Sequence, residues 1–149
     1  MRHASELLVR LLPGVWLGLL IGISFIETPL KFRAPEITLE RGLGIGRIVF
    51  HALNRVELVI AVVLLIALFG GRPGVGNVTR WALVVTVVAL LVQVFVLRPV
   101  LDRRLDERVA GHAPASSMHH VAYIGLEVLK VGALATVSIS IAARSRMLG

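Results

Sequence analysis

Acidic, basic and imidazole side chains lie inside long apolar stretches of this sequence, where they could bind a cation or a small ligand. One stretch carries His51, Arg55 and Glu57, and another carries Glu127 and Lys130. Ionisable groups inside a bilayer are costly, usually face the bundle interior, and are functional candidates by default. We therefore predict a single ligand- or ion-binding site in one half of the molecule. Its expected members are Glu27, His51, Asn54, Arg55, Glu57, Gln93, Tyr123, Glu127 and Lys130.

The imidazole and carboxylate groups leave two cofactor alternatives open. Carboxylates and imidazoles that converge from several helices hold divalent metals in di-iron bundles, although the Glu-x-x-His pair of those bundles is missing here. His51 facing His119 or His120 could instead ligate a haem. A chain of Glu, His and Lys side chains could also relay protons or pass an ion. The candidate metal ligands are His51, Glu57, His119, His120 and Glu127.

The same residues also have a purely structural interpretation. Buried ion pairs can fix the register of helices without binding a ligand. The paired charges would then be Glu27, Arg55, Glu57, Glu127 and Lys130. Trp16 and Trp81 are expected to serve packing or an interfacial aromatic belt. The chain has no cysteine and no legible Ser-His-Asp or nucleophile motif, which favours a protein that is not an enzyme.

The composition excludes an ordinary soluble domain. Of the 149 residues, 56% are hydrophobic and 17% are charged, and the mean hydropathy is +0.86. A soluble domain is usually about half apolar and about a quarter charged. The net charge of +7 comes from basic residues that lie mainly at the ends of apolar segments. This placement indicates contact with anionic lipid headgroups and not with nucleic acid.

Four apolar stretches are long enough to cross a bilayer. A hydrocarbon core ~30 Å thick needs roughly 20 helical residues, and helices satisfy their own backbone hydrogen bonds in lipid. Helices are predicted over 7–26, 48–71, 81–97 and 118–143, within one transmembrane domain covering 1–149. The charged segments 29–46 and 99–117 are expected to be loops, although 99–117 also fits an amphipathic extension of the third helix or an interfacial helix.

The predicted fold class is therefore an all-α integral membrane protein, a four-transmembrane-helix bundle. Its expected location is the cell inner membrane, with several passes and both termini on the same side. Six basic residues on one face against eight on the other leave the orientation open.

Residues in the first half of the sequence match residues in the second half at a constant spacing. This spacing, which is the one between Glu57 and Glu127, is here called the repeat offset. Each half has an uncharged helix, a charged segment and a helix with buried charge, so the repeats would be parallel, related by an axis near the membrane normal. A duplication would place Glu57 and Glu127 at equivalent positions. The matching pairs are Phe25 and Phe95, Pro29 and Pro99, Arg33 and Arg103, Glu36 and Asp106, and Glu57 and Glu127.

Short motifs at the helix ends resemble the transmembrane protein 205 family, with its bacterial domain of unknown function. The first helix leads into Phe25-Ile26-Glu27-Thr28-Pro29, the second begins with Phe50-His51, the third ends near Arg98-Pro99, and the fourth opens with His120. The resemblance covers most of the chain. It implies a four-helix membrane protein of poorly defined activity, linked to drug or metal tolerance in the animal member.

A second pattern resembles the membrane-associated eicosanoid and glutathione metabolism family, whose members also have four helices. Arg47, Asn54 and Glu57 fit the spacing of its second-helix motif, and Phe32-Arg33 lies at a similar upstream distance. The Arg-x-x-Tyr signature after the third helix is missing, because the one tyrosine is Tyr123. The resemblance implies a glutathione-dependent membrane transferase.

The leading functional prediction is a small polytopic membrane protein that binds or passes an ion, metal or small ligand through the polar cluster. An accessory or scaffold subunit of a membrane complex is the second prediction, and the glutathione-dependent transferase is the third. The expected partners are the lipid bilayer, with anionic headgroups at the basic ends, and either further copies of the chain or a membrane complex.

Overall fold

Four helical rods form the bundle in the computed structural model, which describes residues 2–71, 74–112 and 118–147. All four are long and apolar enough to cross a membrane, which confirms the predicted all-α four-helix membrane bundle. Two of the rods contain a short π-helical stretch, labelled η. The elements are α1 (Arg2–Leu20), η1 (Ile21–Glu27), α2 (Thr28–Lys31), α3 (Leu39–Gly71), α4 (Asn77–Val92), η2 (Gln93–Leu97), α5 (Arg98–Val109) and α6 (Met118–Met147).

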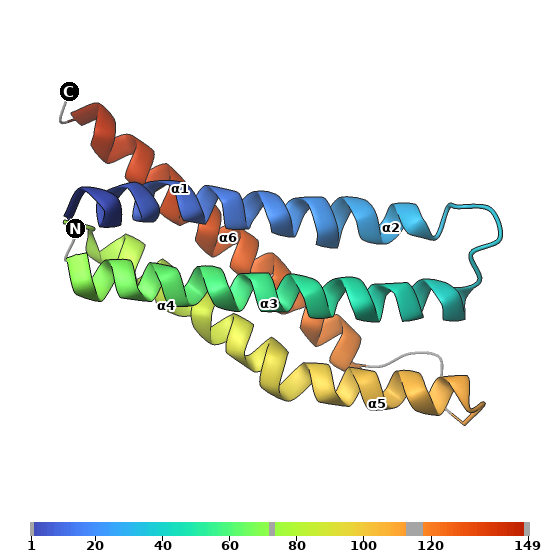
Figure 1. Cartoon of the computed structure of the whole chain (residues 1–149). Coiled ribbons are helices and arrows are strands. Elements are labelled where there is room, and N and C mark those ends of the chain that lie inside the picture. The colour runs from blue at the N-terminus through green and yellow to red at the C-terminus, as the bar shows by residue number, and fades with distance from the viewer. Residues whose placement is uncertain (1, 72–73, 113–117, 148–149) are drawn as a thin grey trace.

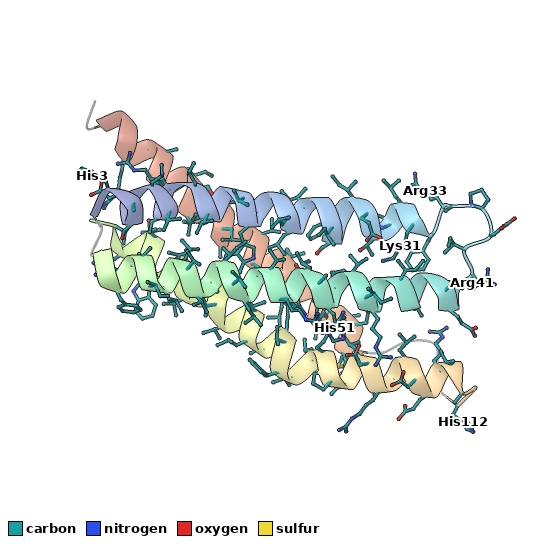
Figure 2. The ribbon with its side chains drawn as sticks, viewed as in Figure 1. His3, Lys31, Arg33, Arg41, His51 and His112 are labelled. Atoms are coloured by element: carbon teal, nitrogen blue, oxygen red, sulfur yellow. The ribbon has the colours of Figure 1, made fainter. Side chains whose placement is uncertain are left out.

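The rods alternate in direction, so the bundle has two distinct ends (Figure 1). The first residues of α1, the end of α3 with the start of α4, and the last described residues of α6 lie at one end, here called the termini end. The link from α2 to α3 and the last residues of α5 lie at the other, here called the loop end. Figure 2 places Lys31, Arg33, Arg41 and His112 at the loop end and His3 at the termini end. The first residues of α6 stop short of the loop end, so α2, α3 and α5 extend beyond it there.

The helices are longer at the loop end than the sequence analysis expected. Residues 39–46 belong to α3, and residues 99–109 continue the third rod as α5, so the loop assignment was wrong for these two stretches, whereas 32–38 do connect α2 to α3. The extension of the third helix is the alternative that the structure bears out. Two glycines of α3 have a packing reason: a Cβ on Gly42 would collide with the Phe32 ring, and one on Gly46 would lie 3.0 Å from Lys31 Nζ.

A proline explains the π-helical stretch in each half of the chain. Proline lacks an N–H and its ring clashes with the carbonyl four residues earlier, so an α-helix must adjust around it. The residue before Pro29, Thr28, donates its N–H to the Ile23 carbonyl, five residues back. The residue before Pro99, Arg98, donates in the same way to the Gln93 carbonyl. The same adjustment therefore occurs twice, at positions related by the repeat offset.

Burial follows the repeat offset as well, which supports the predicted duplication. Nine positions that are buried in the first half are matched by buried positions in the second, whereas the buried Asn54 corresponds to the exposed Ile124. The matched pairs are Val9 and Thr79, Pro13 and Leu83, Trp16 and Thr86, Leu20 and Leu90, Leu53 and Tyr123, Glu57 and Glu127, Ile60 and Lys130, Leu64 and Leu134, and Ala67 and Val137. Corresponding helices of the two halves thus present corresponding faces to the core.

The apolar part of the core fills the bundle from its middle to the termini end. Trp16 and Leu20 of α1 pack there with Leu64 of α3, Leu90 of α4 and Leu134 of α6. Large apolar side chains also cover the outside, as expected where acyl chains and not water surround the protein. Examples of these exposed side chains are Ile66, Phe69, Val78, Trp81, Phe95 and Ile139.

Candidate functional site

Two carboxylates converge on one lysine inside the bundle. Lys130 Nζ lies 2.5 Å from Glu57 Oε1 and 3.4 Å from Glu127 Oε1. The side chains of Lys130 and Glu57 are fully enclosed, and that of Glu127 is 3% exposed. Two ionised carboxylates and one ammonium group do not balance: they sum to one negative charge in a medium of low dielectric constant.

Neutral side chains complete this group, so that all four rods contribute to it. Trp16 of α1 donates its indole N–H to Glu57 Oε1 at 2.8 Å. Gln93 of η2 donates its amide N–H to Glu127 Oε1 at 3.3 Å and to the Tyr123 carbonyl at 3.1 Å. The Tyr123 hydroxyl donates to Asn54 Oδ1 at 3.2 Å. We call these residues the buried cluster: Trp16, Asn54, Glu57, Gln93, Tyr123, Glu127 and Lys130.

The buried cluster leaves several polar atoms without a hydrogen-bond partner among the described residues. The second oxygens of both carboxyl groups, Glu57 Oε2 and Glu127 Oε2, are enclosed and unpaired, as are Gln93 Oε1 and Asn54 Nδ2. Buried polar atoms are usually paired, so each unpaired one indicates a missing proton, water or ion. Two unpaired carboxyl oxygens beside one shared lysine mark the group that can take up a positive charge.

The cluster lies near the middle of the long rods. At 1.5 Å per residue, Glu57 is about 27 Å along α3 from Leu39. Lys130 is about 18 Å along α6 from Met118. The described residues toward the termini end bury threonines, Thr79 and Thr86, but no charged side chain. The bundle therefore has a polar half toward the loop end and an apolar half, as the sequence predicted.

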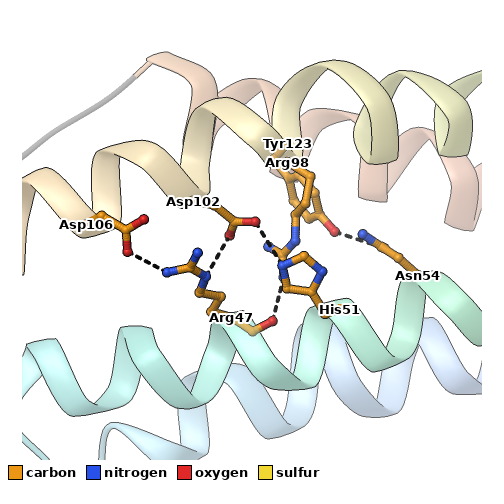
Figure 3. A network of polar contacts seen from close by, with 7 residues as sticks. All are labelled: Arg47, His51, Asn54, Arg98, Asp102, Asp106 and Tyr123. Carbon is orange, nitrogen blue, oxygen red and sulfur yellow. Dashed lines mark hydrogen bonds and ion pairs between the residues drawn. The ribbon is translucent and has the colours of Figure 1, made fainter.

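A second polar network joins α3 to α5 nearer the loop end (Figure 3). Arg47 pairs with Asp106 through Nη1 at 2.6 Å and with Asp102 through Nε at 3.4 Å. His51 Nε2 lies 2.8 Å from the other oxygen of Asp102. Arg98 donates from Nη2 to the Arg47 carbonyl at 2.8 Å, and its guanidinium lies over the rings of Phe50 and Tyr123. The contact of the Arg98 guanidinium with the Tyr123 ring connects this network to the buried cluster.

Two adjoining cavities lead from the loop end toward the buried cluster. The larger, about 570 Å³, lies between α2, α3 and α5. The smaller, about 290 Å³, is lined by Glu127 and Tyr123 at its inner side. The residues that line both cavities are Thr28, Phe50, Arg98, Leu101 and His120.

Six of the nine predicted site residues meet in the buried cluster, and three do not. Those that meet are Asn54, Glu57, Gln93, Tyr123, Glu127 and Lys130. Arg55 is exposed, because it lies two residues before Glu57 and such neighbours point to different sides of a helix. Glu27 is half-buried and pairs with Lys31 at 3.4 Å. His51 is half-buried and pairs with Asp102.

The five candidate metal ligands are not gathered at one point. Among the described residues, no group of three or more His, Asp or Glu side chains is placed to hold a metal ion. His51 meets Asp102, the enclosed Nδ1 of the half-buried His119 has no partner in the described part of the chain, and His120 lines the cavities. Glu57 and Glu127 meet through Lys130. The described residues therefore give the metal alternative no assembled ligand set, and His51, the residue named for a haem, contacts Asp102.

The residues of the glutathione-type spacing also diverge. Arg47 pairs with the aspartates of α5, Asn54 accepts from Tyr123, and Glu57 holds Lys130. Arg47 thus lies in the α3–α5 network, apart from Asn54 and Glu57 in the buried cluster.

Trp16, Arg98 and Asp102 belong to the polar networks, although none of them was among the predicted site residues. Trp16 was assigned to packing or an aromatic belt, yet its ring is enclosed and its N–H binds Glu57. The sequence does indicate that Trp16 faces the core, because Val9, Pro13, Trp16 and Leu20 have the spacing of one helix face. Arg98 and Asp102 were placed at or beyond the end of a helix, and the continuation of that helix as α5 is what brings them inside.

One family model matches the chain over residues 11–110, and its description is "Domain of unknown function (DUF4149)". No curated protein and no solved structure matches the chain. The matched range contains Glu57 and Gln93 of the buried cluster and the whole α3–α5 network, while Glu127 and Lys130 lie beyond it.

Proposed function

The chain belongs to the DUF4149 family, a domain of unknown function, and from that premise we propose that it is a small multi-pass membrane protein that binds and releases a proton at the buried cluster. The observation that carries this proposal is the pair of enclosed carboxyl groups that share the single lysine Lys130. The proposal selects the proton among the ions, metals and small ligands that the sequence left open.

Charge balance supports a bound proton. An unbalanced charge in the interior of a bundle is costly, and such a group usually neutralises. One added proton makes the group formed by Glu57, Glu127 and Lys130 neutral. It also turns one unpaired carboxyl oxygen into a hydroxyl, which can donate a hydrogen bond. Glu127 is the expected carrier, because its oxygen lies farther from Lys130 Nζ than that of Glu57, 3.4 Å against 2.5 Å.

Access from the loop end supports a proton over a metal cation. Glu127 lines the smaller cavity, so its carboxyl group borders the route that leads outward past Arg98 and His120. The larger cavity beyond is lined by the cationic side chains of Lys31, Arg47 and Arg98. Fixed positive charges repel a metal ion. A proton can move along hydrogen-bonded groups and through water in the cavities.

The resemblance to the transmembrane protein 205 family stays a prediction, and the residues that carry it surround this route. The motif residues that line the smaller cavity are Phe25, Thr28, Pro29, Phe50, Arg98 and His120. We place the protein in the cell inner membrane with both termini on one side. The common position of the described ends of α1 and α6 supports the shared side (Figure 1).

Infrared spectroscopy of the purified protein tests the proton. We expect the carbonyl band of a protonated carboxyl group in the wild-type protein at neutral pH. Glu127→Gln should remove it, because an amide does not absorb at the same place. Glu107→Gln on the exposed face of α5 is the matched control and should keep the band.

Two outcomes would contradict the proposal. No protonated carboxyl in the wild-type protein, or a band that persists unchanged in both Glu127→Gln and Glu57→Gln, would leave a merely structural ion cluster and favour the scaffold alternative. Retention of a stoichiometric sodium, potassium or divalent ion in elemental analysis, lost in Glu127→Gln, would identify a metal cation in place of the proton.

A further inference from the structure

We propose that the larger cavity at the loop end binds the anionic headgroup of a lipid-like amphiphile, with its acyl chain along the apolar wall. The shared chemistry is a phosphate or carboxylate attached to a hydrocarbon chain. This site lies between α2, α3 and α5 and is distinct from the proton site, which it does not require.

The charge of the cavity wall is the first argument. Five of its lining residues are cationic at neutral pH, and Asp102 is the acidic residue among them. Asp102 is already engaged by Arg47 and His51. Lys31 also pairs with Glu27 and Arg47 with Asp106. The positive charge that an anion would balance is therefore carried chiefly by Arg98, which has no ion pair among the described residues. The cationic residues are Lys31, Arg47, Arg98, Arg104 and Arg108.

Arg98 gives the strongest single indication of an anion. Its side chain is more than nine-tenths buried and lines both cavities. It donates to a backbone carbonyl through Nη2, but Nε has no hydrogen-bond partner, and no carboxylate lies within ion-pair distance among the described residues. An enclosed guanidinium without a counter-charge is costly. Arginine binds phosphate and carboxylate with two parallel N–H groups, so an anionic headgroup would supply the missing partner.

The rest of the wall fits a hydrocarbon chain. Leu39, Leu43, Leu101 and Leu105 line the cavity together with the ring of Phe32. Lys31 lies close to the rings of Phe32 and Phe50, so its ammonium group sits where polar and apolar walls meet. A soluble anion would contact only the cationic side chains. An amphiphile would contact the cationic side chains with its headgroup and the leucines with its acyl chain.

The position of the cavity in the bundle also favours a lipid. It lies at the loop end, where α2, α3 and α5 extend past α6 (Figure 1), and the first turn of α6 closes its inner side with His120 and Val121. The helices there still carry exposed apolar side chains such as Leu30, Leu39 and Ile45. Charged side chains begin at the same level, as they do where a bilayer passes from acyl chains to headgroups. A lipid could therefore reach the cavity from the side.

Binding of defined short-chain lipids to the detergent-purified full chain tests the proposal. The probes are dioctanoyl phosphatidylglycerol, which is anionic, dioctanoyl phosphatidylcholine, which is zwitterionic, and inorganic phosphate, which has no chain. Native mass spectrometry or calorimetry gives the affinities. We expect phosphatidylglycerol to bind at least about tenfold more tightly than either other probe, since one charge-assisted contact accounts for about a factor of ten.

Variants of three arginines of α5 distinguish binding in the cavity from general attraction to basic surface charge. Arg98→Gln and Arg104→Gln alter the cavity wall, while Arg103→Gln removes the same charge from an exposed position outside it. We expect about tenfold weaker phosphatidylglycerol binding in the first two and no change in the third. Arg104 is only partly buried, so its variant keeps the test valid even when Arg98→Gln folds poorly.

Three results would overturn the proposal. Equal weakening by Arg103→Gln would show surface attraction and no site. Equal affinity for phosphatidylcholine would show that Arg98 does not select an anion, and equal affinity for inorganic phosphate would identify a soluble anion as the ligand. Glu127→Gln should leave lipid binding unchanged, so failure here and failure of the proton site can be told apart.

Discussion

The two halves of the chain bury matching positions, and they differ most at the position that carries Ile60 in the first half and Lys130 in the second. Both side chains are buried, and both lie three residues after a glutamate, Glu57 or Glu127. A duplicated unit with a buried glutamate supplies two carboxyl groups to the centre of the bundle. A lysine in only one unit then gives two acids and one base. The charge imbalance at the buried cluster thus follows from one departure from symmetry.

A second departure from symmetry shapes the loop end. In the first half, Glu27 and Lys31 form an i,i+4 pair on the first rod. Their counterparts at the repeat offset are Leu97 and Leu101, and the residue between them that turns inward is Arg98. Lys31 therefore enters the larger cavity from one rod and Arg98 from the equivalent rod. The two repeats contribute cations to the same cavity by different residues.

Removal of the unmatched lysine should have the largest effect of any single change in the cluster. Lys130→Met leaves two enclosed carboxyl groups without an ammonium partner, and breaking a buried ion pair costs about 3–5 kcal/mol. Ile60→Met is the matched control in the other half and should cost less than about 1.5 kcal/mol, because it conserves volume. Unfolding in mixed detergent micelles measures both. Equal losses would show that Lys130 contributes by packing and not by charge.

The architecture was predictable because apolar length and the repeat offset are properties of the sequence itself. The buried faces followed from the same pattern, since Glu57, Glu127 and Lys130 lie in stripes of helical spacing. The helix ends at the loop end were not predictable in this way. Charged residues such as Asp102 lie in a segment that fitted either a loop or an extension of the third helix. The structure shows that the helix continues through this segment as α5.

The contacts between rods required the structure. The rotation of α1 against α3 decides that Trp16 reaches Glu57, and no residue pattern within α1 specifies it. Similarly, Arg98 follows an apolar run and precedes a proline, so it was expected at the helix exit. The π-helical stretch η2 places it on the buried side, over Phe50 and Tyr123.

The two equivalent glutamates should respond differently to the same change. Glu57→Gln removes the closest counter-ion of Lys130 and should lower the unfolding free energy by about 3 kcal/mol, the lower end of the range for buried pairs, because Glu127 remains. Glu127→Gln should change it by less than about 0.5 kcal/mol, since glutamine has the shape of a protonated glutamate and leaves the Lys130–Glu57 pair intact. A larger loss for Glu127→Gln would reverse the assignment of the proton.

Substitution of Arg55 should have the smallest effect on stability. Arg55 was predicted to belong to the site, but the structure places it on the exposed surface. Arg55 and its counterpart Gly125 are both exposed, so this pair of positions contributes no charge to the core in either half. Arg55→Gln should therefore shift the unfolding free energy by less than about 0.5 kcal/mol, as for most surface substitutions. The measurement is the same unfolding experiment, with Lys130→Met beside it. A loss comparable to that of Lys130→Met would mean that Arg55 turns inward and supplies the second positive charge, and the cluster would then need no added proton.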